Sequence, residues 1–178
     1  MDILISDISH LHFAKDISNC IDQSAKVRGT GIARRSAEYI AEKIKNKNSI
    51  IAIENNEFAG FCYIEVWGHG KYVAHSGLIV SPKHRGKGLA KIIKKNVFDL
   101  SKQKFPEAKI FGITTGKAVM RINFELGYRP VSFSELTDDP EFWKGCQTCK
   151  NYDVLTRTER SMCLCTGMLY DPNNGQKQ

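Results

Sequence analysis

The chain has 178 residues, of which 42% are hydrophobic and 25% are charged. A chain of this length and balance can form one soluble domain with a sizeable core. No apolar run approaches the roughly 18 residues that a membrane-spanning helix needs, and the short acidic start, Met1 to Ile5, does not resemble a secretory signal. We therefore expect one domain over residues 1–178, no membrane partner and a cytoplasmic location.

Positive charge exceeds negative charge, with 26 Lys and Arg residues against 19 Asp and Glu residues and a net charge of +7. A basic balance suits a polyanion, such as a nucleic acid, an anionic lipid or a small phosphorylated cofactor. The excess gathers between residues 83 and 95, around a turn with two glycines. A phosphorylated cofactor is a sufficient partner for this charge, so we expect no nucleic-acid partner. We expect Lys94 and Lys95 on a solvated helix face.

In the first half of the chain, hydrophobic periodicity predicts two helices and an antiparallel sheet. The strands are expected at residues 3–6, 49–54, 58–67 and 72–80. A weak helical pattern covers residues 8–23, and the glycines of residues 27–32 predict a loop. Ser36 suits the N-cap of a second helix, which ends near residues 45–48.

The second half of the chain continues with a long amphipathic helix and then alternates between strands and helices. The long helix is predicted by five apolar residues at helical spacing: Leu89, Ile92, Ile93, Val97 and Leu100. Beyond it we expect strands at residues 109–114, 128–133 and 163–170, a helix at 117–126 and a helix start at 138–143. Gly127 sits where a C-cap glycine belongs, and residues 173–178 form a polar tail that we expect to be frayed.

The most informative stretch runs from Leu78 to Ala90 and contains an apolar strand, a basic turn with two glycines and the start of the long helix. Such a turn leaves the first N–H groups of the helix without partners inside the helix, and the helix dipole adds positive potential there. Gly86 and Gly88 let the backbone approach phosphate oxygens, since neither carries a Cβ atom. The turn is therefore predicted to bind a pyrophosphate; the alternative is a tight connection whose basic residues are only solvated.

The run Arg85-Gly86-Lys87-Gly88-Leu89-Ala90 resembles the coenzyme A-binding motif of the GNAT superfamily of N-acetyltransferases. The resemblance implies an α/β GNAT fold, in which a mixed and mainly antiparallel sheet has helices on both faces. It also implies acetyl-CoA as the co-substrate. In that family the pantetheine arm lies where the strands before and after the central helix splay apart. It pairs there with the backbone of the first strand, here Leu78, Ile79 and Val80.

Residues 31–38, which contain Arg34-Arg35-Ser36, and residues 113–136 resemble the acetyltransferase domain of N-acetylglutamate synthases. In that family the arginines help to bind the carboxylates of glutamate, which implies Arg35 first and Arg34 second as acceptor-binding residues. A planar guanidinium suits this role because it can pair with a carboxylate through two hydrogen bonds. The alternative is that both arginines only flank a helix start. The resemblance implies a glutamate-like acceptor and a place in arginine biosynthesis.

The chain also departs from these families. The amino-acid kinase domain that often precedes such acetyltransferase domains is absent from the 178 residues. The segment of residues 115–127 is longer than the corresponding segment of the family. Either Lys117 or Arg121 can therefore correspond to a further arginine of the family. Many GNAT enzymes carry a tyrosine near the coenzyme thiol, where this chain has Asn123. An asparagine can donate a hydrogen bond to the coenzyme, but it cannot donate a proton to sulfur.

Transfer of an acyl group to an amine needs a base that removes a proton from the ammonium form. Glu65 and His75 are the candidates, and both are expected near the centre of the sheet. The ordinary pKa of histidine suits this role, whereas the pKa of a glutamate must be raised by burial. The alternatives are that His75 is a hydrogen-bonded core histidine and that Glu65 faces solvent.

Four of the six cysteines form two close pairs in a Cys-containing extension over residues 140–170: Cys146 with Cys149, and Cys163 with Cys165. Four thiols in this spacing can hold a structural Zn²⁺ ion. The alternative is that Cys163 and Cys165, at alternate positions of a strand, are core thiols. Cys20 and Cys62 are expected to be small core residues.

The leading hypothesis is an N-acetyltransferase that acts on a small amino acid, most readily a glutamate-like one. A transferase for protein N-termini or lysines is a second hypothesis, and it predicts an open acidic groove. The third hypothesis is a non-catalytic acyl-CoA sensor or a zinc-bearing nucleic-acid module. Such a module predicts a continuous basic face with exposed aromatic residues and salt-sensitive binding.

Overall fold

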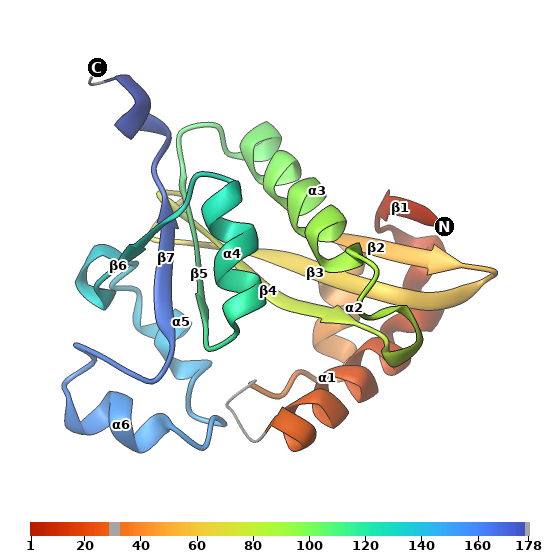
Figure 1. Ribbon diagram of the computed structural model, residues 1–178, viewed down its shortest axis with the longest axis horizontal. Coiled ribbons are helices and arrows are strands. Elements are labelled where there is room, and N and C mark those ends of the chain that lie inside the picture. Colours follow the sequence, from red (N-terminus) through yellow and green to blue (C-terminus); the bar gives the residue numbers. More distant parts are fainter. Residues whose placement is uncertain (29–32, 177–178) are drawn as a thin grey trace. The chain divides into compact units, whose positions relative to one another are not determined.

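The computed structural model describes residues 1–28 and 33–176 of the chain, and it contains a mixed sheet with helices (Figure 1). The strand order is β1-β2-β3-β4-β5-β7-β6. The strands are β1 (Asp2–Ile5), β2 (Ser49–Glu54), β3 (Glu57–Trp67), β4 (Tyr72–Val80), β5 (Lys109–Thr114), β6 (Arg129–Val131) and β7 (Thr166–Tyr170). The pairs β1–β2, β2–β3, β5–β7 and β6–β7 are antiparallel, and β4–β5 is parallel. This confirms the expected mixed, mainly antiparallel sheet.

Six α-helices and four 3-10 helices accompany the sheet in the described part of the chain. The α-helices are α1 (Ala14–Arg28), α2 (Ala37–Lys45), α3 (Leu89–Lys104), α4 (Lys117–Glu125), α5 (Pro140–Lys144) and α6 (Tyr152–Arg157). The 3-10 helices are η1 (Ile8–Phe13), η2 (Pro82–His84), η3 (Phe133–Glu135) and η4 (Pro172–Gln176). None of these helices is both long enough and apolar enough to cross a membrane.

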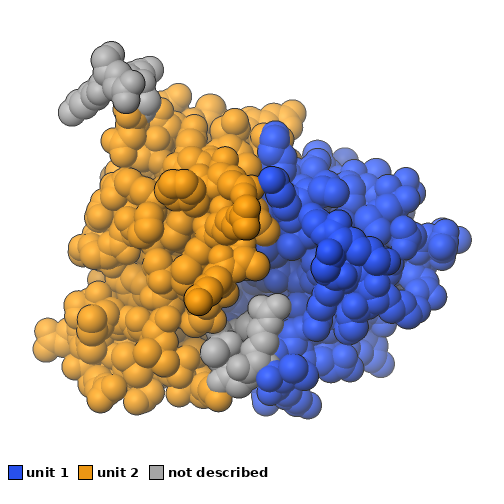
Figure 2. Space-filling view, in the orientation of Figure 1, with its two compact units in different colours: residues 1–65, 75–97 blue, residues 66–74, 98–178 orange. Residues whose placement is uncertain are grey.

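The chain divides into two compact units (Figure 2). Unit 1 contains Met1–Glu65 and His75–Val97, and unit 2 contains Val66–Ala74 and Phe98–Gln178. The strands β3 and β4 and the helix α3 each contribute residues to both units. The assignment of residues 1–178 to one domain therefore remains a proposal, which this continuity supports.

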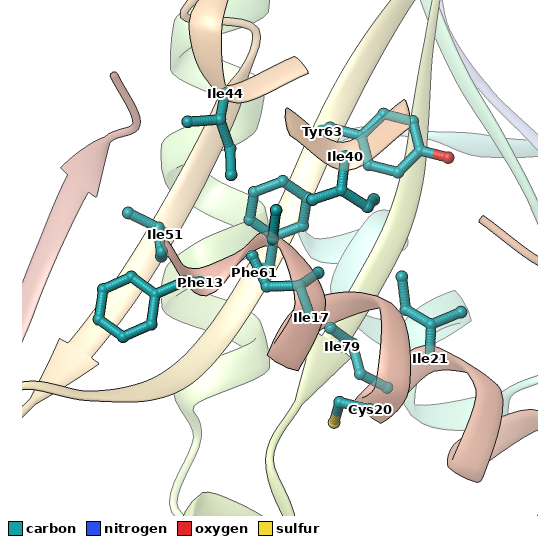
Figure 3. Packing of buried hydrophobic residues seen from close by; sticks show 11 residues of the cluster. Phe13, Ile17, Cys20, Ile21, Ile40, Ile44, Ile51, Phe61, Tyr63 and Ile79 are labelled. Carbon is teal, nitrogen blue, oxygen red and sulfur yellow. The ribbon is translucent and has the colours of Figure 1, made fainter. Parts of the chain in front are cut away.

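The core of unit 1 lies between α1, α2 and one face of the sheet (Figure 3). Side chains of a strand alternate between its faces, and Phe61 and Tyr63 of β3 pack on this face with Ile17 of α1 and Ile40 of α2. Gly60, which directly precedes Phe61, belongs to the opposite face. A Cβ atom at Gly60 would lie 2.5 Å from Cδ1 of Ile93, so the glycine allows α3 to pack closely on β3.

The core of unit 2 gathers aromatic residues from β5, η3 and α5. Phe111 and Trp143 are its largest buried members, and the indole N–H of Trp143 donates to the carbonyl of Thr137 at 2.8 Å. Asp139 caps α5, because its carboxylate accepts a hydrogen bond from the N–H of Glu141 at 3.0 Å. The expected helix start after residue 138 is thus confirmed.

Several expectations for individual segments are wrong. Helix α1 continues through Val27 to Arg28, where a loop is expected; residues 29–32 of that loop lie outside the described residues. The last strand begins at Thr166, so Cys163 and Cys165 precede it rather than alternate along it. Residues 172–176 form η4, and residues 177 and 178 of the expected frayed tail lie outside the described residues.

Two side chains of α3 differ in exposure from what the sequence predicts. Lys94 is only 2% exposed, although a solvated face is expected. It follows Ile93 directly and precedes Val97 by three residues, so the helical period places it in the buried stripe. Ile92 is 47% exposed instead, while Lys95 is exposed as expected.

Candidate active site

The glycine turn joins η2 to α3 in unit 1. Gly86 and Gly88 have φ angles of 77° and 79°, a left-handed conformation that residues with side chains rarely adopt. A Cβ atom at either glycine would meet no described atom within 4 Å, so the turn is open to a ligand. Lys87 between them is exposed, and α3 begins at Leu89. The expected elements of a pyrophosphate site therefore lie together: open backbone, a helix N-terminus and a lysine.

Arg85 holds the turn in place rather than pointing freely at a ligand. Its Nε atom donates to the carbonyl of Val80 at 3.0 Å, and its Nη2 atom donates to Oγ of Ser24 in α1 at 3.0 Å. His84 is buried and contacts Oε2 of Glu54 through Nε2 at 3.0 Å. Sequence reasoning missed His84, because a histidine inside a basic run carries no separate signal.

The strand β4 leads into the turn, and its last residues are the expected pantetheine-binding residues. Ile79 packs in the core of unit 1, while Leu78 and Val80 are half-buried. Gly77, just before them, has a φ of 63°, and a Cβ atom there would overlap the ring of Tyr63. A glycine is thus required both by the backbone conformation and by the tyrosine.

Asn123 is the buried residue of α4 in unit 2, with 1% of its surface exposed. Its side-chain Oδ1 atom has no hydrogen-bond partner among residues 1–28 and 33–176. An unsatisfied buried acceptor is costly, so its presence favours a ligand that supplies an N–H or S–H donor. Tyr128 is 1% exposed and belongs to the core, as expected.

A polar cluster in unit 1 joins α2 to β3 and begins with Arg35. The Nε atom of Arg35 donates to the hydroxyl of Tyr63 at 2.6 Å, and Nη1 donates to the carbonyl of Arg34 at 3.0 Å. The guanidinium carbon lies 5.4 Å from the ring centroid of Tyr39. Arg34 itself is exposed, so the structure favours Arg35 over Arg34 as the residue that belongs to this cluster.

Glu65 completes the cluster and is 8% exposed. Its carboxylate accepts a hydrogen bond from the hydroxyl of Tyr39 and lies 3.9 Å from Nζ of Lys43. Nζ of Lys43 is also 4.4 Å from the ring centroid of Tyr39. Tyr39 thus lies between two cations and positions the carboxylate. Sequence reasoning missed it, although Arg35, Tyr39 and Lys43 follow one another at four-residue spacing.

The protonation states of the cluster follow from burial and charge. Burial and the nearby Glu65 carboxylate raise the pKa of Tyr39 and of Tyr63, so both hydroxyls keep their protons. Burial acts to lower the pKa of Arg35, but Tyr63, Glu65 and Tyr39 outweigh it and the net pKa is raised. The cluster therefore presents a fixed guanidinium and hydroxyl donors beside one carboxylate.

His75 does not join this cluster. It is buried, and burial followed by the charge of Lys94 lowers its pKa well below 6.5. Burial also lowers the pKa of Lys94 from 10.5 to about 8, and it raises the pKa of Cys62 to about 11.

The four C-terminal cysteines lie near one another in unit 2. Burial raises the pKa of Cys165 to about 12, and nearby Cys163, Cys149 and Cys146 add to the effect. However, within residues 1–28 and 33–176 no group of three or more His, Cys, Asp or Glu side chains is arranged to hold a metal ion. The thiols thus gather as expected, and the structural zinc site that their spacing predicts stays a prediction.

Comparison with known proteins relates part of the chain to a protein family. Residues 37–118 match the model of the Acetyltransferase (GNAT) family. An N-acetylglutamate synthase from Neisseria gonorrhoeae, complexed with coenzyme A and N-acetyl-glutamate, matches 97% of this chain with a TM-score of 0.67 at 15% identity. This chain spans only 35% of that synthase. A search of curated proteins finds no match.

Two further solved structures match almost end to end. A protein from Mycobacterium tuberculosis in complex with CoA has a TM-score of 0.67 at 13% identity, over 96% of this chain and 99% of that chain. The diaminobutyrate acetyltransferase of Paenibacillus lautus, in complex with L-2,4-diaminobutyric acid and coenzyme A, has a TM-score of 0.64 at 11% identity. That match covers 96% of this chain and 94% of that chain.

The sheet, the glycine turn and these matches define a fold shared with acetyltransferases that were solved with coenzyme A. Residues 37–118 are similar to the GNAT acetyltransferases, and the fold of the chain resembles that of the acetyltransferase domain of N-acetylglutamate synthase.

Proposed function

We propose that the protein transfers the acetyl group of acetyl-CoA to the amino group of a small α-amino acid, with glutamate as the leading acceptor. The observation that carries this proposal is the polar cluster that contains both Arg35 and Glu65. The guanidinium of Arg35 donates to Tyr63 and lies near the ring of Tyr39, whose hydroxyl donates to Glu65. An α-amino acid carries a carboxylate and an ammonium group on the same carbon. A fixed guanidinium beside a carboxylate suits such a zwitterion, because each charge meets its opposite.

The proposed roles in catalysis follow from this arrangement. Arg35 binds the α-carboxylate, and Glu65 accepts a proton from the ammonium group, directly or through one water molecule. The neutral amine then attacks the thioester carbonyl, the carbon–sulfur bond breaks, and the thiolate of coenzyme A leaves and takes up a proton. His75 is the alternative base, since its lowered pKa keeps it neutral. We favour Glu65, because it lies in the same cluster as Arg35.

The coenzyme is proposed to bind along β4 and the glycine turn. The backbone of Gly86, Lys87, Gly88, Leu89 and Ala90 would hold the pyrophosphate, and Leu78 to Val80 would pair with the pantetheine arm. Coenzyme A is present in the solved relatives from Neisseria gonorrhoeae and Paenibacillus lautus, which also contain small amino-acid ligands. A glutamate acceptor would connect the reaction with arginine biosynthesis.

The experiment that tests this proposal is a thiol-release assay with acetyl-CoA against a panel of acceptors. The panel contains glutamate, glutamine, 2,4-diaminobutyrate, 4-aminobutyrate and a short peptide with a free N-terminus. We expect the highest kcat/KM with an α-amino acid and none above background with 4-aminobutyrate, which lacks the α-carboxylate. A preference for the peptide would refute a free amino acid as acceptor. A parallel series with succinyl-CoA tests the acyl donor.

A further inference from the structure

The four C-terminal thiols lie between the end of α5 and the start of β7, all within unit 2. The backbone of Asn151 links the two pairs: its N–H donates to Sγ of Cys149 at 3.4 Å, and its carbonyl accepts from the thiol of Cys163 at 3.9 Å. Cys149 and Cys163 therefore both contact the backbone of one residue, Asn151, from different segments of the chain.

These thiols differ from the other two cysteines of the chain. Cys20 and Cys62 are 8% and 0% exposed, whereas the four C-terminal cysteines are all partly exposed. Thiol–disulfide exchange requires access of a small molecule to sulfur and a second thiol nearby. Only the C-terminal group meets both conditions among the described cysteines.

We propose that Cys149 and Cys163 form a reversible disulfide by exchange with a low-molecular-weight disulfide of the glutathione type. The thiolate of Cys149 attacks one sulfur of the small disulfide, which releases one small thiol and leaves a mixed disulfide on Cys149. The thiolate of Cys163 then attacks the Cys149 sulfur and releases the second small thiol. Two protein thiols are oxidised, one small disulfide is reduced to two thiols, and the two protons from the protein thiols pass to the leaving thiolates.

The pairing is assigned to Cys149 and Cys163 because both contact Asn151, and because a bridge between them joins two segments. The bridge would close a loop that contains α6 and fix the segment that leads into β7. Since β7 pairs with both β5 and β6, the bridge would restrain the strand that connects them.

The proposal is tested on the full-length protein after purification in reductant and measurement of its zinc content. The protein is incubated with increasing ratios of oxidised to reduced glutathione, alkylated and digested, and the peptides are identified by mass spectrometry. We expect a mass lower by about 2 Da, a linked peptide pair that contains Cys149 and Cys163, and full reversal by dithiothreitol. Thermal unfolding should occur at a higher temperature in the oxidised form, because the bridge restrains the unfolded chain.

Matched variants assign the bridge. Cys149→Ser and Cys163→Ser should each abolish the linked peptide pair, whereas Cys20→Ser should retain it. If a variant fails to fold, peptide mapping of the oxidised wild-type protein shows which two cysteines are linked. Three results would overturn the proposal: thiols that remain reduced at every ratio, glutathione adducts without a bridge, or about one zinc per chain that protects all four thiols.

Discussion

Replacement of Lys94 by methionine should stabilise the protein, although it removes a charged residue. Lys94 is 2% exposed, and burial lowers its pKa from 10.5 to about 8. Its ammonium group is therefore less stable in the folded protein than in water. Methionine has a similar length and flexibility and no charge, so Lys94→Met should remove this cost while it keeps the packing of α3.

The size of the effect follows from the pKa of Lys94. A tenfold change in proton affinity corresponds to about 1.4 kcal/mol, so a fall in pKa from 10.5 to about 8 destabilises the folded state by roughly 3 kcal/mol at neutral pH. Below pH 8 Lys94 is protonated in both the folded and the unfolded protein, and the whole destabilisation is present. Between pH 8 and 10.5 the folded state releases its proton first, the unfolded state binds more protons, and stability rises with pH. Above that range the cost disappears.

The measurement is urea unfolding of the wild type and of Lys94→Met between pH 7 and 10.5. The difference in unfolding free energy should be roughly 3 kcal/mol at pH 7 and should shrink toward zero at the upper end. Lys95→Met is the matched control, since Lys95 is the exposed neighbour on the same helix; it should change stability by less than about 0.5 kcal/mol at any pH. A Lys94→Met protein less stable than the wild type at pH 7 would refute the reasoning.

Three further predictions concern the substrate sites. Gly88→Glu should abolish coenzyme A binding in calorimetry while circular dichroism stays native, because it places a side chain and a negative charge in the open turn; unchanged affinity would contradict the phosphate site. Arg35→Ala should raise the KM of the acceptor by about ten- to a hundredfold and leave that of acetyl-CoA nearly unchanged, since a charge-assisted hydrogen bond is worth about 1.5–3 kcal/mol; equal changes in both would indicate a structural role. Tyr39→Phe should lower kcat and alter its pH dependence, because Glu65 loses its hydroxyl donor; an unchanged pH profile would argue against Glu65 as the base.

The sequence predicted the parts of the fold that depend on local patterns. The strands Ser49–Glu54, Tyr72–Val80 and Lys109–Thr114 begin and end where expected, because each is an apolar run between turn residues. The N-cap at Ser36 is also confirmed, with its side chain accepting from the N–H of Tyr39 at 3.2 Å. Local chemistry determines such features, so a single sequence carries them.

The features that the sequence did not predict depend on packing between elements. Lys94 has a charged side chain in a basic run and suits a solvated face, and only the packing of α3 on the sheet buries it. Tyr39 and Lys43 lie on α2, and Arg35 precedes its N-cap. These side chains suit solvent equally well until β3 supplies Tyr63 and Glu65. Helix α6 has only six residues, and its apolar pair at helical spacing, Tyr152 and Leu155, is too short a pattern to predict a helix. In each case the partner element is distant in sequence.

The most direct test of the central claim is identification of the acetylated product. The protein is incubated with acetyl-CoA carrying a ¹³C-labelled acetyl group and an equimolar mixture of glutamate, 4-aminobutyrate and a peptide with a free N-terminus, and the products are analysed by NMR and mass spectrometry. We predict labelled acetyl groups on the α-nitrogen of glutamate, and their loss in Arg35→Ala at low acceptor concentration. Label on the peptide or on 4-aminobutyrate, with none on glutamate, would contradict the account.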